Sequence, residues 1–177
     1  EKERTLEQIL SQHTQTQAIV FVNTKRGVDS CVTACHSMGY SCGSIHGGKG
    51  QDAREAALTG FKRGDFDILV ATDVAGRGID VKGIDLVVNY ELPASIENYT
   101  HRIGRTGRAG RKGTAVSFIT SEDQDIMYDL RQLLIESNNE VPPELERQKA
   151  AKVKPQRDAQ GRVLEGRDAR GMDSIIF

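Results

Sequence analysis

Tryptophan is absent from the 177-residue sequence, and aromatic residues together make up only 5% of it. Proteins that stack nucleic-acid bases on aromatic platforms are therefore disfavoured. The three cysteines are an odd number, which argues against a disulfide framework and for reduced thiols in an intracellular protein. No apolar run approaches the length of a membrane span and no signal-peptide pattern opens the sequence, so we expect no membrane partner.

An excess of charge of one sign is also missing, because 24 Lys and Arg residues face 25 Asp and Glu residues. The net charge of −1 excludes a globally basic nucleic-acid binder but leaves room for local basic patches. A hydrophobic content of 37% predicts one domain with a modest core. We place this domain at residues 1–140, because Pro142-Pro143 begins a charged, aperiodic stretch that indicates a polar C-terminal extension over residues 141–177.

Short apolar runs rich in β-branched residues alternate with helical patterns along the domain. This order predicts an α/β fold with an open, mostly parallel sheet and helices on both faces. Ligands of such sheets bind beyond the carboxyl ends of the strands. We expect strands at residues 18–23, 41–46, 68–73, 86–92 and 114–120, and helices at 1–12, 24–39, 51–62, 95–103 and 121–137, with caps at Thr24 and Ser95 and a Ser121–Gln124 capping box.

Four arginines recur every third residue in YTHRIGRTGRAGRKG, residues 99–113. The planar guanidinium stays charged and suits phosphate oxygens, and the interleaved glycines let the backbone approach a ligand. A merely solvated basic loop is the alternative. The regular spacing favours a site for an anion.

The motifs AIVFVNT, HGGKGQDAR, ATDVAGRGID, VVNYELP and HRIGRTGRAG resemble, in order and spacing, motifs IV, IVa, V, Va and VI of the DEAD-box RNA helicases. The resemblance spans residues 18–120 and implies the second RecA-like lobe of an ATP-dependent RNA-remodelling enzyme. Most members carry an acidic residue where this chain has Gly48. With Ala75-Gly76 and the late PPELE, the chain is most similar to the spliceosomal branch of the family that acts at the 5′ splice site. Nuclear localisation and spliceosomal partners follow from this resemblance alone.

The resemblance also implies roles for individual residues. ATP with Mg²⁺ would be held mainly by the N-terminal RecA-like lobe, a partner outside this chain, while this lobe completes the site. RNA would be bound through its backbone, largely independently of sequence. The implied set is Arg105 and Arg108 as catalytic arginine fingers, Gly78 and Asp80 at the nucleotide, Asn23, Thr24, Gly47, Arg54, Thr72, Asp73 and Arg77 at RNA, and His101 and Arg102 in coupling the lobes.

The sequence also offers alternatives to these predictions. GSIHGGKG at residues 43–50 imitates a phosphate-binding P-loop, but Gly50 replaces the required Ser or Thr, and no DEAD tetrad is present. We therefore expect the isolated chain to neither bind ATP tightly nor hydrolyse it.

The spacing of Cys31, Cys35 and Cys42 does not match that of a zinc-binding set, so no metal is expected. A catalytically inactive RNA- or protein-binding scaffold and a DNA translocase lobe are the competing functions, and residues 144–177 are expected to pack on the lobe or hold a partner.

Overall fold

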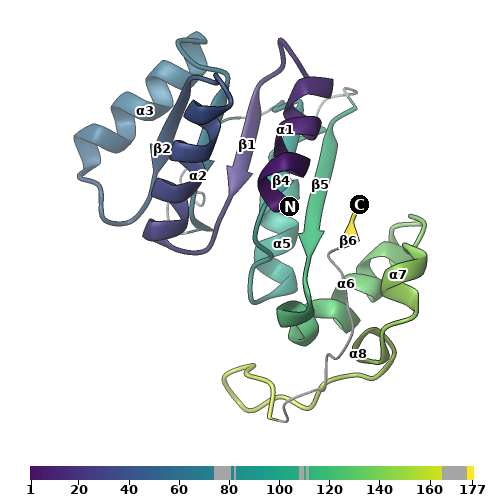
Figure 1. Cartoon of the computed structure of the whole chain (residues 1–177). Helices are drawn as coiled ribbons and strands as arrows, with labels where there is room; N and C mark the ends of the chain where they lie inside the picture. The colour runs from purple at the N-terminus through teal and green to yellow at the C-terminus, as the bar shows by residue number, and fades with distance from the viewer. Residues whose placement is uncertain (74–80, 82, 108–109, 111, 165–174) are drawn as a thin grey trace.

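A six-stranded sheet organises the chain (Figure 1), in a computed structural model that describes residues 1–73, 81, 83–107, 110, 112–164 and 175–177. The strand order is β2-β3-β1-β4-β5-β6. The first five strands are parallel, and only the two-residue β6 runs antiparallel, beside β5. The strands are β1 (Ala18–Phe21), β2 (Cys42–Ile45), β3 (Ile68–Ala71), β4 (Leu86–Asn89), β5 (Thr114–Ile119) and β6 (Ile175–Ile176). The expected mostly parallel α/β sheet is confirmed.

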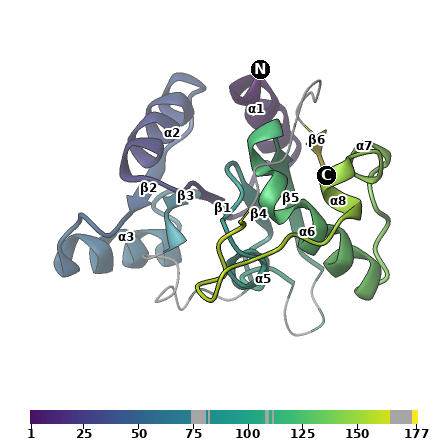
Figure 2. The ribbon, with the colours of Figure 1, turned by 90° about the horizontal axis from the view of Figure 1, so that it is seen from below.

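Helices cover both faces of the sheet, as Figure 2 shows for α1 and α2 on one side and α3 and α5 on the other. Alternation along each strand explains this division, because successive side chains point to opposite faces. In β1, Val20 packs with the α1–α2 core, whereas Ile19 and Phe21 pack with α3. The helices are α1 (Lys2–Gln12), α2 (Lys25–Ser37), α3 (Gln51–Arg63), α5 (Ile96–Ile103), α6 (Gln124–Glu136), α7 (Pro143–Glu146) and α8 (Lys149–Lys152).

Helix caps agree with the sequence in two places and differ in a third. Thr24 caps α2 by accepting from the Gly27 amide at 3.0 Å, and Ser95 caps α5 by accepting from the Asn98 amide at 3.2 Å. The expected Ser121–Gln124 capping box is wrong. A 3₁₀ turn over Ser121–Asp123 precedes α6, and the box joins Thr120 to Asp123 instead. The strand β5 ends one residue earlier than expected, which frees Thr120 to cap this turn.

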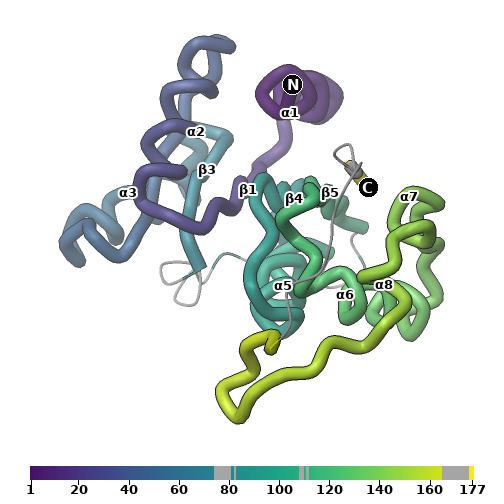
Figure 3. The backbone as a smooth tube through the Cα atoms, turned by 60° about the horizontal axis from the view of Figure 1, so that its bottom comes forward, coloured from purple at the N-terminus to yellow at the C-terminus, as the bar shows by residue number. Residues whose placement is uncertain are grey.

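Helices α7 and α8, which follow residue 140, pack on the lobe. Leu145 and Ala151 are fully buried with Met127 and Leu130 of α6 in one apolar cluster. Figure 3 shows α7 and α8 beside α6, at the opposite end of the molecule from α2 and α3. Leu145 and Ala151 do not stand out from the charged residues around them in the sequence.

The carboxyl-terminal strand ends lie on one edge of the sheet. The Thr72 amide donates to the Ile45 carbonyl at 3.2 Å, and the Val22 amide donates to the Ala71 carbonyl at 3.0 Å. The residues directly after β2, β3 and β1 that the structure describes are therefore adjacent. Parallel topology makes this edge the natural place for a ligand.

Candidate functional site

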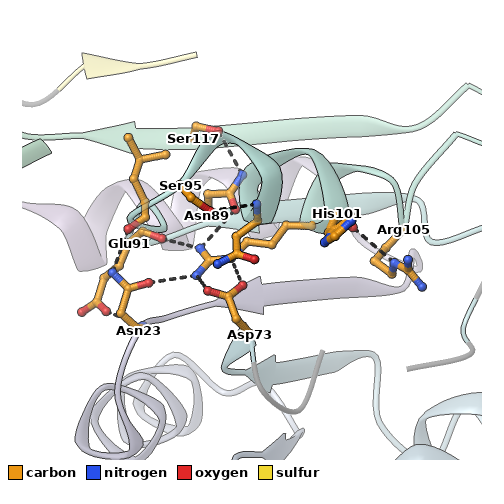
Figure 4. Close-up of polar contacts among 11 residues, drawn as sticks. Asn23, Asp73, Asn89, Glu91, Ser95, His101, Arg105 and Ser117 are labelled. Atoms are coloured by element: carbon orange, nitrogen blue, oxygen red, sulfur yellow. Dashed lines mark hydrogen bonds and ion pairs between the residues drawn. The ribbon is translucent and has the colours of Figure 1, made fainter. Parts of the chain in front are cut away.

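The guanidinium of Arg102 is the centre of the carboxyl edge. Only 2% of the residue is exposed, and its five N–H groups all find acceptors. Figure 4 shows these acceptors converging on one point: Asn23 follows β1, Asp73 follows β3, and Asn89 and Glu91 lie at the end of β4 and just beyond it. The bonds run from Nε to Asp73 Oδ1 at 2.6 Å, from Nη2 to Asp73 Oδ2 at 2.7 Å and Asn23 Oδ1 at 2.8 Å, and from Nη1 to the Glu91 carbonyl at 2.6 Å and Asn89 Oδ1 at 3.4 Å.

Helix α5 delivers this guanidinium to the edge. Ser95 starts the helix, and Tyr99 and Arg102, three residues apart, lie on its buried face. The Arg102 guanidinium lies 5.1 Å from the centre of the Phe21 ring, at the end of β1. A cation over an aromatic face is attracted to it, so the last residue of the central strand also fixes the arginine.

A buried chain of polar side chains supports the centre from behind. Asn89 donates through Nδ2 to Ser117 Oγ at 3.1 Å, and Tyr99 Oη shares a hydrogen bond with the same Ser117 oxygen at 3.0 Å. Asn89 and Ser117 are fully buried. Burial raises the pKa of the Tyr99 hydroxyl, and the bond to Ser117 partly opposes this rise. The hydroxyl therefore stays protonated at neutral pH.

Neither Asn89 nor Ser117 was singled out from the sequence. A signal was available, because each is a polar residue inside an otherwise apolar strand, in LVVN and TAVSFI. A buried polar side chain needs a partner, so two such positions on adjacent strands point to each other.

Arg105 lies just beyond the end of α5. Its side chain is half-buried, and its Nε donates to the His101 carbonyl at 3.3 Å. His101 itself is exposed on the outer side of the helix. The buried Arg102 thus anchors the helix end from which His101 and Arg105 face outward (Figure 4).

The segment from Gly104 to Gly113, called the arginine loop below, has its two ends in contact at its base. The Thr106 hydroxyl donates to the Ile84 carbonyl, and a Cβ built on Gly113 would collide with Thr106 and lie 2.5 Å from the Gly107 amide nitrogen. Gly113 therefore allows the two ends of the loop to touch. A cavity of about 350 Å³ adjoins this base, lined by Gly83, Ile84, Asp85, Gly107 and Lys112.

The RNA-binding residues expected from sequence divide into two groups. Asn23, Thr24 and Gly47 are exposed at the carboxyl edge, where Thr72 is buried and Asp73 pairs with Arg102. Arg54 is half-buried on the first turns of α3. Arg77, Gly78, Asp80 and Arg108 lie outside the described residues, and their expected roles stay predictions.

The expected role of Arg102 in coupling the lobes stays a prediction. Its guanidinium has no N–H left to donate, and every acceptor belongs to this lobe. A direct bond from Arg102 to a second lobe would require breaking this set. Any coupling through it would pass by way of Asn23 or Asp73, whereas His101 is exposed and accessible.

The described residues hold neither a cluster of metal ligands nor a helix that could span a membrane. Within them, no three His, Cys, Asp or Glu side chains are grouped to hold a metal ion. Of the helices that the structure describes, none is both long enough and apolar enough to cross a bilayer.

Comparison with known proteins defines the class of this fold and site. The model of the helicase conserved C-terminal domain matches residues 1–110. That span is more than half of the chain, so the chain belongs to the helicase C-terminal domain family.

Within that family the similarity lies with DEAD-box RNA helicases of the Prp28 type. The chain is 53% identical over 155 residues to DEAD-box ATP-dependent RNA helicase 21 of Oryza sativa, covering 88% of this chain and 21% of the relative. It is 51% identical over 157 residues to the pre-mRNA-splicing ATP-dependent RNA helicase prp-28 of Neurospora crassa, covering 88% and 22%. The crystal structure of the RNA helicase Prp28 from Chaetomium thermophilum bound to ADP superposes with a TM-score of 0.76 at 48% identity, covering 83% of this chain and 37% of that one.

The chain spans about a fifth of the length of these curated relatives. The matched domain model is that of the C-terminal domain of helicases.

Proposed function

We propose that this chain is the C-terminal lobe of an ATP-dependent RNA helicase and completes an ATP site whose phosphate-binding half lies on another lobe. The observation that carries the proposal is the fully hydrogen-bonded guanidinium of Arg102. It fixes the end of α5 and so fixes the backbone position from which the Arg105 side chain extends. Catalysis of phosphoryl transfer depends on positioned positive charge, which a rigid helix end supplies.

Arg105 and Arg108 are the proposed arginine fingers. Their role is to neutralise the charge that builds on the transferring phosphoryl group. An arginine finger contributes about 10³–10⁵ in turnover in related phosphoryl-transfer enzymes. Gly78 and Asp80 are proposed to contact the nucleotide, with Mg²⁺ held by the other lobe.

The exposed carboxyl edge is the proposed RNA surface. Thr24, Gly47, Arg54 and Thr72 offer hydroxyls, backbone amides and one cation, which suit contacts to a sugar–phosphate backbone. Asn23, Asp73 and Arg77 are proposed to link this surface to the nucleotide. Asn23 and Asp73 already share the Arg102 guanidinium, which gives such a link a physical path.

The setting of the proposed activity is nuclear pre-mRNA splicing, with RNA duplexes or RNA–protein complexes as the substrate and spliceosomal proteins as partners. The names of the similar proteins support this choice, since the Neurospora crassa relative is a pre-mRNA-splicing helicase.

RNA-stimulated ATP hydrolysis by the complete parent protein tests the proposal. We expect Arg105→Ala to lower turnover by about a hundredfold or more while RNA affinity stays within about twofold. Arg63→Ala, an exposed arginine at the far end of α3, is the matched control and should turn over normally. Unchanged turnover in Arg105→Ala would mean that the loop only binds, and the inactive-scaffold function would replace the proposal.

A further inference from the structure

Lys25 reaches across the carboxyl edge from one loop to another. It is the first residue of α2, after β1, whereas Gly48 lies in the turn after β2. A Cβ built on Gly48 would lie 2.8 Å from Lys25 Nζ and 2.9 Å from Lys25 Cε. Since β3 separates these two strands in the sheet, the lysine side chain spans the end of β3 and rests on the Gly48 backbone.

The backbone does not require glycine at position 48. The turn is closed by the Lys49 amide, which donates to the His46 carbonyl at 3.1 Å. Gly64, by contrast, has φ +78° and an empty surrounding, so its glycine serves the backbone. No left-handed φ occurs at Gly48. What glycine provides there is space for the lysine.

The charge of Lys25 is not neutralised by the described part of the chain. None of the ion pairs found there includes it. The neighbouring Lys49 ammonium is turned back onto Ser44 Oγ at 2.7 Å, and His46 Nδ1 accepts from the Gly48 amide at 3.0 Å. Lys25 therefore presents its positive charge beside Thr24 and Gly47.

We infer that Lys25 binds a backbone phosphate of RNA and that Gly48 is the residue that keeps this cation available. The inference builds on the proposed function, because it adds one contact to the same RNA surface. An ammonium is a compact point charge that suits a phosphodiester without reading the base. A carboxylate side chain at position 48 would start within contact distance of Nζ and would pair with it. Glycine at this position therefore leaves the ammonium available for a phosphate.

Binding of a fluorescent single-stranded RNA to the complete parent protein, over a series of salt concentrations, tests the inference. We expect Lys25→Gln to weaken binding about three- to tenfold at low salt and to reduce the slope of log affinity against log salt by about 0.7, the value for one phosphate contact on a single strand. Lys62→Gln is the matched control. Lys62 is exposed at the other end of α3, about 17 Å along the helix from Gln51, and its loss should leave both quantities unchanged.

A second pair of variants isolates the contribution of Gly48. Gly48→Asp and Gly48→Asn have side chains of nearly the same shape but different charge. We expect the aspartate variant to bind RNA about threefold or more weaker than the asparagine variant, and this ratio to shrink when Lys25 is replaced by Gln. Turnover at saturating RNA should stay at the wild-type value, so that only the half-saturating RNA concentration rises.

Failure of this inference can be told apart from failure of the proposed function. If Lys25→Gln binds RNA with the wild-type affinity and salt slope while Arg54→Gln binds weakly, the added contact is refuted and the RNA surface stands. If both variants bind normally, the RNA surface itself is wrong. An equal Asp-to-Asn ratio with and without Lys25 would overturn the role of Gly48.

Discussion

Asp73 and Arg102 are joined by two parallel hydrogen bonds, of 2.6 and 2.7 Å, across 29 residues of sequence. The arginine side chain is 1% exposed and the aspartate side chain 25% exposed. This paired geometry matches the fork of a guanidinium to a carboxylate. The pair connects Asp73, just after β3, to the end of α5. It therefore connects the proposed RNA surface to the start of the arginine loop.

Asp73→Asn should destabilise the lobe by about 2–4 kcal/mol, because it leaves a buried guanidinium without its counter-charge. Asp65→Asn is the matched control. Its partner Arg63 is 68% exposed, and surface pairs of this kind contribute at most about 1 kcal/mol. Chemical denaturation of both variants measures the difference. Equal free energies of unfolding would show that the Asp73 pair is not a stability determinant.

Tyr99 makes the stability of the lobe depend on pH in the alkaline range. Burial raises its pKa in the folded state, so the folded chain holds the phenolic proton more tightly than the unfolded chain does. Its contribution is complete below about pH 10 and is lost as the pH rises through the folded-state pKa. Tyr99→Phe should flatten this fall and cost about 1 kcal/mol at pH 7, because Ser117 loses a partner.

Unfolding free energies of Tyr99→Phe measured from pH 8 to 12 check this expectation, with Tyr128→Phe on α6 as the control. Some fall will remain in both variants. Burial raises the pKa of Tyr90 to about 12, and hydrogen bonding to Cys31 raises the pKa of Cys35 to about 12. Identical pH slopes for the two variants would remove Tyr99 as a cause.

Leu145 tests whether the segment beyond residue 140 is part of the folded unit. It is fully buried against Met127 and Leu130, so Leu145→Ala should cost about 2–4 kcal/mol. Leu164, which is 60% exposed, offers the same substitution as a control, with an expected cost within about 0.5 kcal/mol. Thermal denaturation distinguishes the two. A small effect at Leu145 would restore the picture of a loosely attached extension.

The sheet could be predicted from sequence because its strands are buried on both faces and read as unbroken apolar runs, such as AIVF and ILVA. The caps at Thr24 and Ser95 follow from local chemistry and were correct. The boundary before α6 was misjudged because Thr120–Asp123 and Ser121–Gln124 offer similar patterns, and only the end of β5 decides between them.

The site was harder to predict than the fold. The sequence marks Arg102 as one of four equally spaced arginines and does not show that it shares the buried face of α5 with Tyr99 and turns inward. Its acceptors come from Asn23, Asp73, Asn89 and Glu91, up to 79 residues away. Such partners are set by the strand order, which short-range spacing does not encode. The contact of Lys25 with Gly48 depends on the same crossing and was equally hidden.

Substitution of Gly113 tests whether the contact at the base of the arginine loop is needed for turnover. A methyl group there would meet the Thr106 side chain and the Gly107 amide, so Gly113→Ala must push the two ends of the loop apart. Displacement of a catalytic group by about 1 Å can cost about 10²-fold in rate. We expect RNA-stimulated turnover of the parent protein to fall about ten- to a hundredfold. Thr114→Ala, at the exposed next residue, should keep its turnover.

The thermal melting of the Gly113→Ala protein separates the two ways in which turnover could fall. A displaced loop on an intact lobe predicts a cooperative melt, RNA affinity within about twofold of wild type and a large loss of turnover at saturating ATP and RNA. The nearby Thr106–Ile84 bond allows a second test, since Thr106→Val removes this other contact at the base of the loop without adding bulk at position 113. Wild-type turnover in both variants would show that the arginine loop finds its working position without this closure, and Arg105 would then be placed by the Arg102 anchor alone.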